Sequence, residues 1–403
     1  MRKTIAAIAF AFMLSSTARA TNGMRMIGFG PVQNSMGGVG VGATLDASSI
    51  ASNPAGIADL GSRLDVGVGF FKPTVSYTAT GTPLPPPFPP SLIASDGATI
   101  DSDRGGSPIP AVAYVRPLNE QLSAGLGVFA VSGMGVDYPT NLYLSKSLTS
   151  YMNARLAPGV AFKLNDMLSV GATVNVMMAQ MEYDVAAATG QAKHSTATSW
   201  GAGATVGVEA KLSPMFSVGA AYETKSWFQD FSFNVPGGKD DLTFDQPQVA
   251  TLGASVRPME MLLLAADVQW INWADTMGKN LPKYAKNEGG SQAFDMSWKD
   301  QWVLKVGAQL TPMKGLDVRA GYDYGAMPLD RSRAFENLVF PAVAEHHFTL
   351  GAGYAVADKL TVQVTGMYSP EAKISGSNDG QAIAAYSTTM SQFQIDVGGS
   401  YRF

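Results

Sequence analysis

Histidine and serine are the side chains in this sequence whose types could support hydrolytic or metal chemistry. Three histidines occur, His194 and the adjacent pair His346 and His347. A serine hydrolase needs a serine within hydrogen-bond reach of an oriented histidine, and Ser195 beside His194 offers only adjacency in the sequence. In a strand, neighbours such as His346 and His347 point to opposite faces, which disfavours a shared metal ion. We therefore predict no enzymatic activity, no cofactor and no metal site.

The elements that would position such residues show a regular alternation of side-chain character. In the C-terminal strand every second side chain is apolar or small. These side chains are Phe393, Ile395, Val397, Gly399, Tyr401 and Phe403. Polar residues such as Gln394, Asp396 and Arg402 lie between them, so one face suits lipid and the other suits water. An aromatic last residue in such a strand is similar to the assembly signal of bacterial outer-membrane β-barrels. We therefore expect outer-membrane lipid and the barrel assembly machinery as partners.

The N-terminus has the pattern of a secretory signal peptide over residues 1–20. Arg2 and Lys3 precede an apolar run at 5–14, and a small-residue cleavage motif ends at Ala20. A membrane-anchor helix is the alternative, but the apolar run is about half of the roughly 20 residues that span a bilayer. We predict an exported protein of the bacterial outer membrane, with Thr21 as its first mature residue.

Composition narrows the class further. Cysteine is absent, so an exported chain of 403 residues must be held without disulfides. Charged residues make up 15%, below the roughly 25% of soluble proteins, which fits a lipid-facing surface. The net charge of −4 comes without any basic stripe, so we predict no nucleic-acid partner.

Alternation of this kind predicts about fourteen strands after residue 62, each long enough for a tilted crossing of roughly 9 to 11 residues. Their predicted ranges are 63–77, 108–117, 121–132, 150–164, 168–184, 199–212, 216–231, 247–257, 261–273, 298–311, 316–325, 346–356, 360–369 and 392–403. In the first strand the apolar phase changes at Phe71–Pro73, which predicts a β-bulge. Short turns alternate with long loops between strands. The chain is thus predicted to be all-β, a 14-stranded antiparallel transmembrane β-barrel over 63–403.

Residues 21–62 are predicted to form a plug, or hatch, inside this barrel. Fourteen strands enclose a lumen too wide to be filled by wall side chains, since eight strands already enclose a filled or single-ligand interior. Residues 21–62 lack period-two alternation and are rich in Gly, Ala, Ser and Asn. Short helices and turns are therefore expected there.

The hatch segment and one later motif resemble a known family. The hatch contains Gly37-Gly38-Val39-Gly40 and Asn53-Pro54-Ala55-Gly56, and Trp298-Lys299-Asp300 opens the predicted tenth strand. Together with the C-terminal strand, these motifs resemble the FadL/TodX family of outer-membrane transporters for long-chain fatty acids and aromatic hydrocarbons. The resemblance covers nearly the whole mature chain.

What the resemblance implies is passive transport of a hydrophobic small molecule. In the family, the ligand is captured in an extracellular groove, bound in the lumen and released sideways into the membrane beside a kinked third strand. Carried onto this chain, the hatch motif is Asn53, Pro54, Ala55 and Gly56, and the lateral opening lies at Gly133 and Gly135. The substrate-binding residues would be Met24, Met26, Ile27, Phe29 and Lys299.

Two expectations concern side-chain direction. Lys299 shares strand parity with Gln301 and Lys305, so it is expected to point into the lumen and to be free to pair with a carboxylate. Aromatic residues near strand ends are expected to form interfacial girdles. These residues include Tyr138, Tyr143, Trp227, Phe228, Trp270, Trp273, Trp298, Trp302, Tyr322 and Tyr324.

Several alternatives stay open from the sequence. A general diffusion porin is the main rival, and an adhesin or purely structural barrel is a third possibility. A fatty-acid carrier would need a further basic residue after the fifth strand, where this chain has Met177-Met178-Ala179-Gln180-Met181-Glu182-Tyr183. That segment favours a neutral hydrophobic substrate. A closed barrel needs no second subunit, so a monomer is expected.

Overall fold

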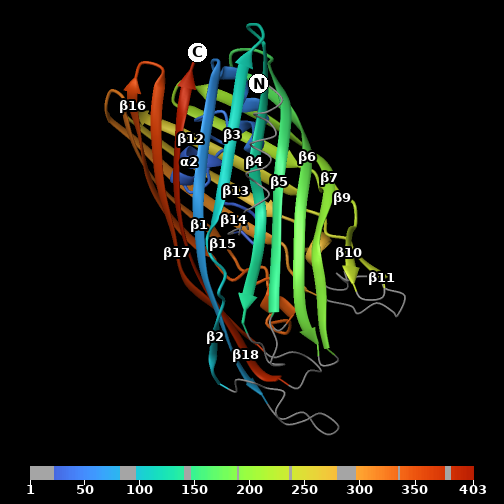
Figure 1. The fold of residues 1–403 in the computed structure, drawn as a ribbon. Coiled ribbons are helices and arrows are strands. Elements are labelled where there is room, and N and C mark those ends of the chain that lie inside the picture. Colours follow the sequence, from blue (N-terminus) through green and yellow to red (C-terminus); the bar gives the residue numbers. More distant parts are fainter. Residues whose placement is uncertain are drawn as a thin grey trace.

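The computed structural model describes residues 22–81, 97–139, 147–187, 190–235, 238–278, 296–334, 336–376 and 383–403. The predicted signal peptide and Thr21 lie outside these residues. Fourteen long strands form a closed antiparallel barrel (Figure 1), which confirms the predicted fold class. They are β1 (Arg63–Gly81), β3 (Ser107–Pro117), β4 (Leu122–Tyr138), β5 (Ser147–Lys163), β6 (Leu168–Ala187), β7 (Gly190–Ser213), β8 (Phe216–Glu223), β12 (Val249–Met259), β13 (Leu262–Ile271), β14 (Gln301–Met313), β15 (Leu316–Gly325), β16 (His346–Ala357), β17 (Leu360–Gly376) and β18 (Ile383–Arg402).

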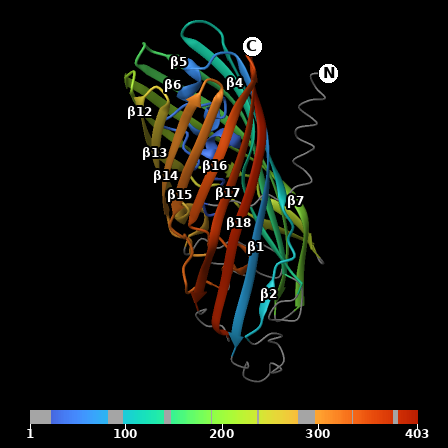
Figure 2. The same ribbon diagram turned by 90° about the vertical axis from the view of Figure 1, so that its left-hand side faces the viewer.

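The barrel is closed by the first and last of these strands. β1 pairs with β18 from Arg63 opposite Arg402 to Gly81 opposite Ile383, and the two lie side by side in Figure 2. On β18 the apolar side chains Phe393, Ile395 and Val397 are 44–50% exposed on the outer surface. The alternate side chains Gln394 and Asp396 are buried in the lumen. The outer surface is thus the lipid-facing one, as the alternation predicts.

β18 is longer than predicted because it extends beyond the apolar belt. It begins at Ile383, whereas the predicted strand begins at 392. Between Phe393 and Phe403 the outer row is apolar or small, a height of about 25 Å for a strand tilted by about 40°. Before Phe393 the outer row is Ser387, Thr389 and Ser391, which suits water rather than lipid. The strand therefore continues out of the membrane.

β1 changes polarity at the same height without a bulge. Val66, Val68 and Phe70 point outward and are about half exposed, whereas Phe71 and Val75 are buried inside. The register with β18 runs unbroken through these residues, so the predicted bulge at Phe71–Pro73 is wrong. Along the strand, the apolar positions change from the outward-facing row to the inward-facing row. After Phe70, β1 is therefore polar on its outer face and largely apolar on its inner face.

Shorter elements lie between the long strands in the sequence. They are β2 (Thr99–Asp101), β9 (Trp227–Phe228), the hairpin of β10 (Phe231–Val235) and β11 (Gly238–Leu242), α4 (Ala274–Met277) and the 3₁₀ turn η3 (Glu336–Val339). The predicted strand 216–231 is instead split into β8, β9 and the start of β10. No helix in the described part of the chain is long and apolar enough to cross a membrane.

Residues 22–62 fold as short helices and turns against the inner face of the barrel (Figure 1). They contain α2 (Gly30–Ser35), α3 (Ser49–Ser52) and the 3₁₀ helix η1 (Pro54–Asp59). α2 contacts β1, β3 and β15 to β18, while η1 contacts β4 to β7. The segment therefore reaches opposite sides of the wall and fills the lumen between them.

Candidate functional site

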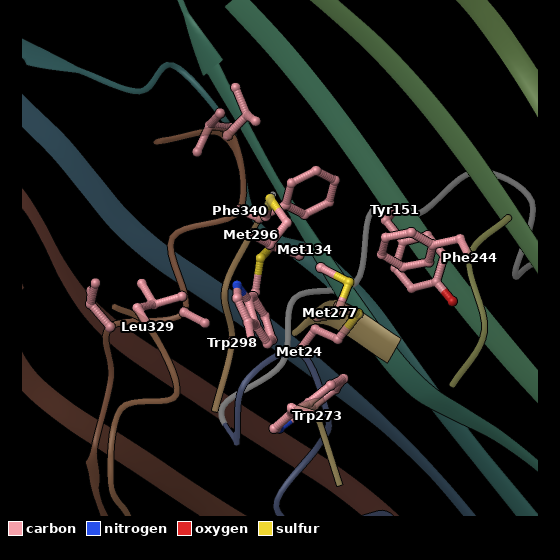
Figure 3. Packing of buried hydrophobic residues seen from close by; sticks show 14 of the residues in the cluster. Met24, Met134, Tyr151, Phe244, Trp273, Met277, Met296, Trp298, Leu329 and Phe340 are labelled. Carbon is pink, nitrogen blue, oxygen red and sulfur yellow. The ribbon is translucent and has the colours of Figure 1, made fainter. Parts of the chain in front are cut away.

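An apolar cluster occupies the lumen next to the tip of the hatch. Figure 3 shows Met24 together with methionines of the wall and loops around two tryptophans. Trp273 and Trp298 are fully buried, and their rings meet edge to face with centroids 5.1 Å apart. Trp273 Nε1 donates to Gln301 Oε1 at 3.2 Å, and Trp298 Nε1 donates to Asn337 Oδ1 at 2.6 Å. With both indole donors bonded, the rings present apolar surface to the cluster.

Methionines from several elements belong to the same cluster as these tryptophans. The cluster includes Met24 from the hatch, Met134 from β4, Met277 from α4 and Met296, each at most 3% exposed. Unbranched thioether side chains change shape easily and make favourable contacts with aromatic rings. Such a site suits a hydrophobic ligand of variable shape. Because both tryptophans are buried here, the girdle prediction is wrong for them. It is also wrong for Tyr138 and Phe228, which are 0% and 8% exposed and belong to the same cluster. Tyr143 lies outside the described residues.

The four predicted hatch contacts gather in the lumen. Met24, Met26 and Ile27 are at most 6% exposed and belong to the apolar cluster. Phe29 packs against Phe129 of β4, with ring centroids 5.2 Å apart. Their assignment as substrate-binding residues stays a prediction.

A tight turn places Met24 at this position. Asn22 and Arg25 exchange backbone hydrogen bonds of 2.9 and 3.0 Å, and Gly23 between them has a φ of +66°. A β-carbon on Gly23 would lie 2.7 Å from the indole ring of Trp273. Gly23 is therefore required both by the turn and by the close approach of the backbone to the tryptophan.

Lys299 does not point into the lumen, so that expectation is wrong. Its side chain is 68% exposed and forms a 2.9 Å ion pair with Asp330 in the loop before β16. The Ser332 backbone amide and the Lys299 ammonium together lower the pKa of Asp330 to about 2. The reason is that β14 begins only at Gln301 and Ser297 has a left-handed φ of 47°, so strand parity does not extend back to Lys299.

Lys305 is the lumenal lysine of β14 instead. It is 5% exposed, and its Nζ donates a 2.7 Å hydrogen bond to the backbone oxygen of Ile27. Lys305 of the wall therefore fixes the hatch near its N-terminal end through the carbonyl oxygen of Ile27.

A buried charge cluster also holds the hatch tip. Arg25 donates to both carboxylate oxygens of Glu223, at the end of β8, at 3.1 and 2.9 Å. Arg155 of β5 donates to the same carboxylate, and all three residues are at most 6% exposed. One carboxylate therefore serves two guanidinium groups inside the lumen.

The first residue of the Asn53–Gly56 motif connects the hatch to the barrel wall. Asn53 Oδ1 accepts from the amide of Ala55 at 3.2 Å and so caps η1, with Pro54 in the first turn. Asn53 Nδ2 donates to the backbone oxygens of Val41 and Val208, each at 3.1 Å. The side chain therefore ties two parts of the hatch to β7 of the wall.

Wall glycines allow hatch backbone and side-chain atoms to approach the strands closely. At Gly207 a β-carbon would lie 2.0 Å from Asn53 Oδ1, and at Gly219 it would lie 2.1 Å from the oxygen of Val41. We call the glycines in such contacts the glycine belt. They are Gly67, Gly171, Gly207, Gly219, Gly253, Gly307, Gly321, Gly351 and Gly398.

Asp267 of β13 also binds the hatch to the wall. Its carboxylate accepts from the amides of Gly40, Val41 and Gly42 at 2.8–3.1 Å. The belt and this anchor together leave the hatch backbone in direct contact with the wall.

The third barrel strand, β4, has no pairing with β3 over part of its length, although its pairing with β5 continues there. Its pairing with β3 ends at Phe129 opposite Ala111, whereas its pairing with β5 continues to Tyr138 opposite Ser147. Further along, the amide of Asp103 donates to the oxygen of Asp137 at 2.8 Å. Between these points β4 pairs with no described strand of the wall on its β3 side.

The two predicted glycines lie within this interval. The ladder to β5 shifts register between Ala130 and Ser132, just before the two glycines. The lateral opening at Gly133 and Gly135 stays a prediction. A β-carbon at Gly135 would lie 2.2 Å from the backbone oxygen of Thr149, which explains this glycine by close packing. The amide of Gly133 donates to the oxygen of Met24 at 3.0 Å, so the hatch tip itself lies beside β4.

Comparison with known proteins assigns a family. The family model described as "Outer membrane protein transport protein (OMPP1/FadL/TodX)" matches residues 7–401. A search of curated proteins finds no match.

Solved structures share the fold. The toluene transporter TodX of P. putida is similar with a TM-score of 0.76 at 19% identity, over 93% of this chain and 99% of that chain. The toluene transporter TbuX of Ralstonia pickettii gives 0.70 at 18% identity, over 93% and 98%. A Pseudomonas aeruginosa FadL homologue gives 0.72 at 18% identity, over 96% and 99%. Because the family model covers nearly the whole sequence, this chain belongs to the OMPP1/FadL/TodX family of outer-membrane transport proteins.

Proposed function

We propose that this transporter carries neutral hydrophobic small molecules and releases them sideways into the membrane. The proposed binding site, called the Met–Trp cluster, consists of Met24, Met134, Met277, Met296, Trp273 and Trp298. The observation that carries the proposal is the cluster itself, in which buried methionines and two tryptophans face one another next to the hatch tip. Burial of an apolar ligand there gains about 0.8 kcal/mol per methylene. No catalytic step and no energy source is part of the proposal.

The charges near the cluster favour a neutral ligand over an anionic one. Arg25 and Arg155 are both bonded to Glu223, and Lys305 is bonded to the oxygen of Ile27. A fatty-acid carboxylate would have to compete with these buried partners and repel Glu223. Two of the similar structures are toluene transporters by name, which agrees with a neutral aromatic ligand.

The lateral route is supported by the contrast between hatch and wall. The glycine belt brings hatch and wall backbones into contact, whereas β4 has no described wall partner on its β3 side beyond Phe129. A hydrophobe in the cluster is also next to Met134 of that same strand. The interval of β4 from Ala130 to Val136 is therefore our proposed opening, for a single barrel acting alone.

A labelled uptake panel tests this function. Cells with and without the protein are given radiolabelled toluene and a radiolabelled long-chain fatty acid. We expect protein-dependent uptake of toluene and much weaker uptake of the fatty acid. Equal uptake with and without the protein would support an adhesin or structural barrel. A large steady ionic current from purified protein in a planar bilayer would support a porin.

Gly207→Val tests the seal between hatch and wall. The added side chain meets Asn53 at a position with no free space, and overpacking of this kind costs about 1–3 kcal/mol. We expect the hatch to be displaced and the ionic current across a planar bilayer to rise above that of the wild type. Gly366→Val is the matched control, because a β-carbon there has no atom within 4 Å. An ionic current of Gly207→Val equal to that of the wild type would contradict a tight contact between hatch and wall.

A further inference from the structure

The hatch tip takes the place of a wall strand beside β4. The amide of Met26 donates to the oxygen of Val131 at 3.0 Å, and the amide of Gly133 donates to the oxygen of Met24 at 3.0 Å. Arg25 and Ser132 therefore face each other as an antiparallel bridge. We call residues 22–26 the gate segment. It covers the edge of β4 beyond the end of the β3–β4 ladder, with one bridge rather than a full ladder.

A single antiparallel bridge joins the gate segment to the wall, and side-chain contacts add to it. Besides the bridge, Asn22 Nδ2 donates to Asp323 Oδ2 at 3.0 Å, and Arg25 binds both oxygens of Glu223. The Arg25 pair is bidentate and buried, which makes it the strongest type of contact among these. Its loss would leave mainly neutral hydrogen bonds and apolar packing.

Glu223 differs from an ordinary ion-pair partner because it has a second arginine. Arg155 is fully buried in the middle of β5, and it binds Glu223 Oε1, the same oxygen that accepts from Arg25 Nη1. If Arg25 moves away, Glu223 keeps a buried cation, so the carboxylate is not left unpaired at high cost. If Glu223 is neutralised, two guanidinium groups remain close together in a site of low polarity and repel each other.

We propose that Glu223 is a positioning residue that keeps the gate segment docked on β4 through its ion pair with Arg25. When the segment leaves β4, the Glu223 carboxylate binds Arg155 alone. The proposal rests on the proposed lateral route, since it concerns what closes that opening. Arg155 is fixed by the β5 ladder on both sides, whereas Arg25 lies on a segment with a single bridge. Repulsion between the two arginines therefore displaces the gate segment and not the wall.

Glu223→Gln tests the positioning role without reference to transport. Hydrogen exchange of the purified full-length protein is followed at the amides of Met26 and Gly133, which form the bridge. We expect at least tenfold faster exchange at both amides, with no change at mid-strand amides of β16. Glu223→Asp should restore slow exchange in part. Glu209→Gln is the control, because Glu209 contacts the hatch at Thr44, away from the gate segment. Unchanged exchange in Glu223→Gln would overturn the proposal.

A reversible crosslink tests whether undocking is needed for release. Arg25 and Ser132 form a pair flanked by, and not joined by, backbone hydrogen bonds, a geometry with Cα atoms about 4.5 Å apart that suits a disulfide. The chain has no cysteine of its own, so Arg25→Cys/Ser132→Cys adds a single possible bond. We expect the oxidised variant to lose at least tenfold in toluene uptake and to regain it on reduction.

The outcomes separate this proposal from the proposed function. Equal uptake by the oxidised and reduced variants would overturn the gate role while leaving hydrophobe transport intact. Absence of protein-dependent uptake in the wild type would overturn the proposed function, whereas the exchange experiment on Glu223→Gln would still decide the role of Glu223.

Discussion

Replacement of Trp298 by alanine is expected to weaken the binding of toluene by about 30-fold, or about 2 kcal/mol. Trp298 is fully buried against Trp273, and its indole nitrogen is already bonded to Asn337. Its removal takes away a rigid aromatic wall of the proposed site and leaves an amide oxygen without its donor. Equilibrium binding of radiolabelled toluene to purified protein measures the change.

Trp302→Ala is the matched control for this experiment. Trp302 is four residues further along the chain, but it points outward and is 62% exposed to lipid. We expect toluene affinity to stay within twofold of the wild type in this variant. Heat-dependent migration on a gel shows whether each barrel has folded. Equal affinities for both folded variants would place the ligand outside the Met–Trp cluster.

Asn53→Ala is expected to release the hatch from β7. The variant loses the cap of η1 and two hydrogen bonds to buried backbone oxygens, which together amount to about 3 kcal/mol. We expect faster hydrogen exchange at the amide of Ala55 and reduced uptake of toluene. The barrel ladder itself keeps its hydrogen bonds and should stay folded.

Asn165→Ala provides the comparison for the hatch variant. The Asn165 side-chain oxygen likewise bonds the backbone, accepting from the amides of Met167 and Leu168 at 2.9 Å, but it does so in an exposed turn between β5 and β6. Loss of that turn contact should leave uptake and the exchange of Ala55 unchanged. If Asn53→Ala behaves in the same way, the assignment of the hatch motif is wrong.

The barrel could be predicted from the sequence because lipid imposes a period of two on every crossing. On β18, Phe393 to Phe403 alternate without interruption, and the same solvent acts on all fourteen strands. The extension of β18 back to Ile383 was missed, since outside the lipid both rows of a strand can be polar. The polarity change in β1 was misread as a bulge for a related reason. Apolar side chains at Phe71 and Val75 face an apolar lumen that the sequence pattern alone does not reveal.

The site was only partly predictable because it depends on loops and long-range pairs. The resemblance predicts that Met24, Met26 and Ile27 lie in the lumen, and the structure buries all three there. The lumenal position predicted for Lys299 is wrong, since strand parity does not hold before the first residue of β14.

A signal for the buried charge cluster was present in the sequence. In β8 the outward row contains Phe216 and Tyr222, which places Glu223 on the lumenal row. In β5, Arg155 likewise shares the parity of the buried Tyr151. A charged residue on the lumenal row near the hatch level is thus a marker of such a contact. Which partners it selects could not be predicted, because Arg25 is 198 residues away from Glu223.

The change of polarity in β1 has a consequence for the free-energy profile of a passing hydrophobe. The last pair between β1 and β3 joins Phe71 to Ser107, close to the level at which the β3–β4 ladder ends at Phe129. The apolar inner lining therefore stops where the apolar outer belt starts, and the unpaired part of β4 lies at that junction. A molecule crossing the wall there exchanges one hydrocarbon-like surface for another. Its partition free energy stays nearly level along the proposed route, without the barrier that a hydrated or polar step would impose.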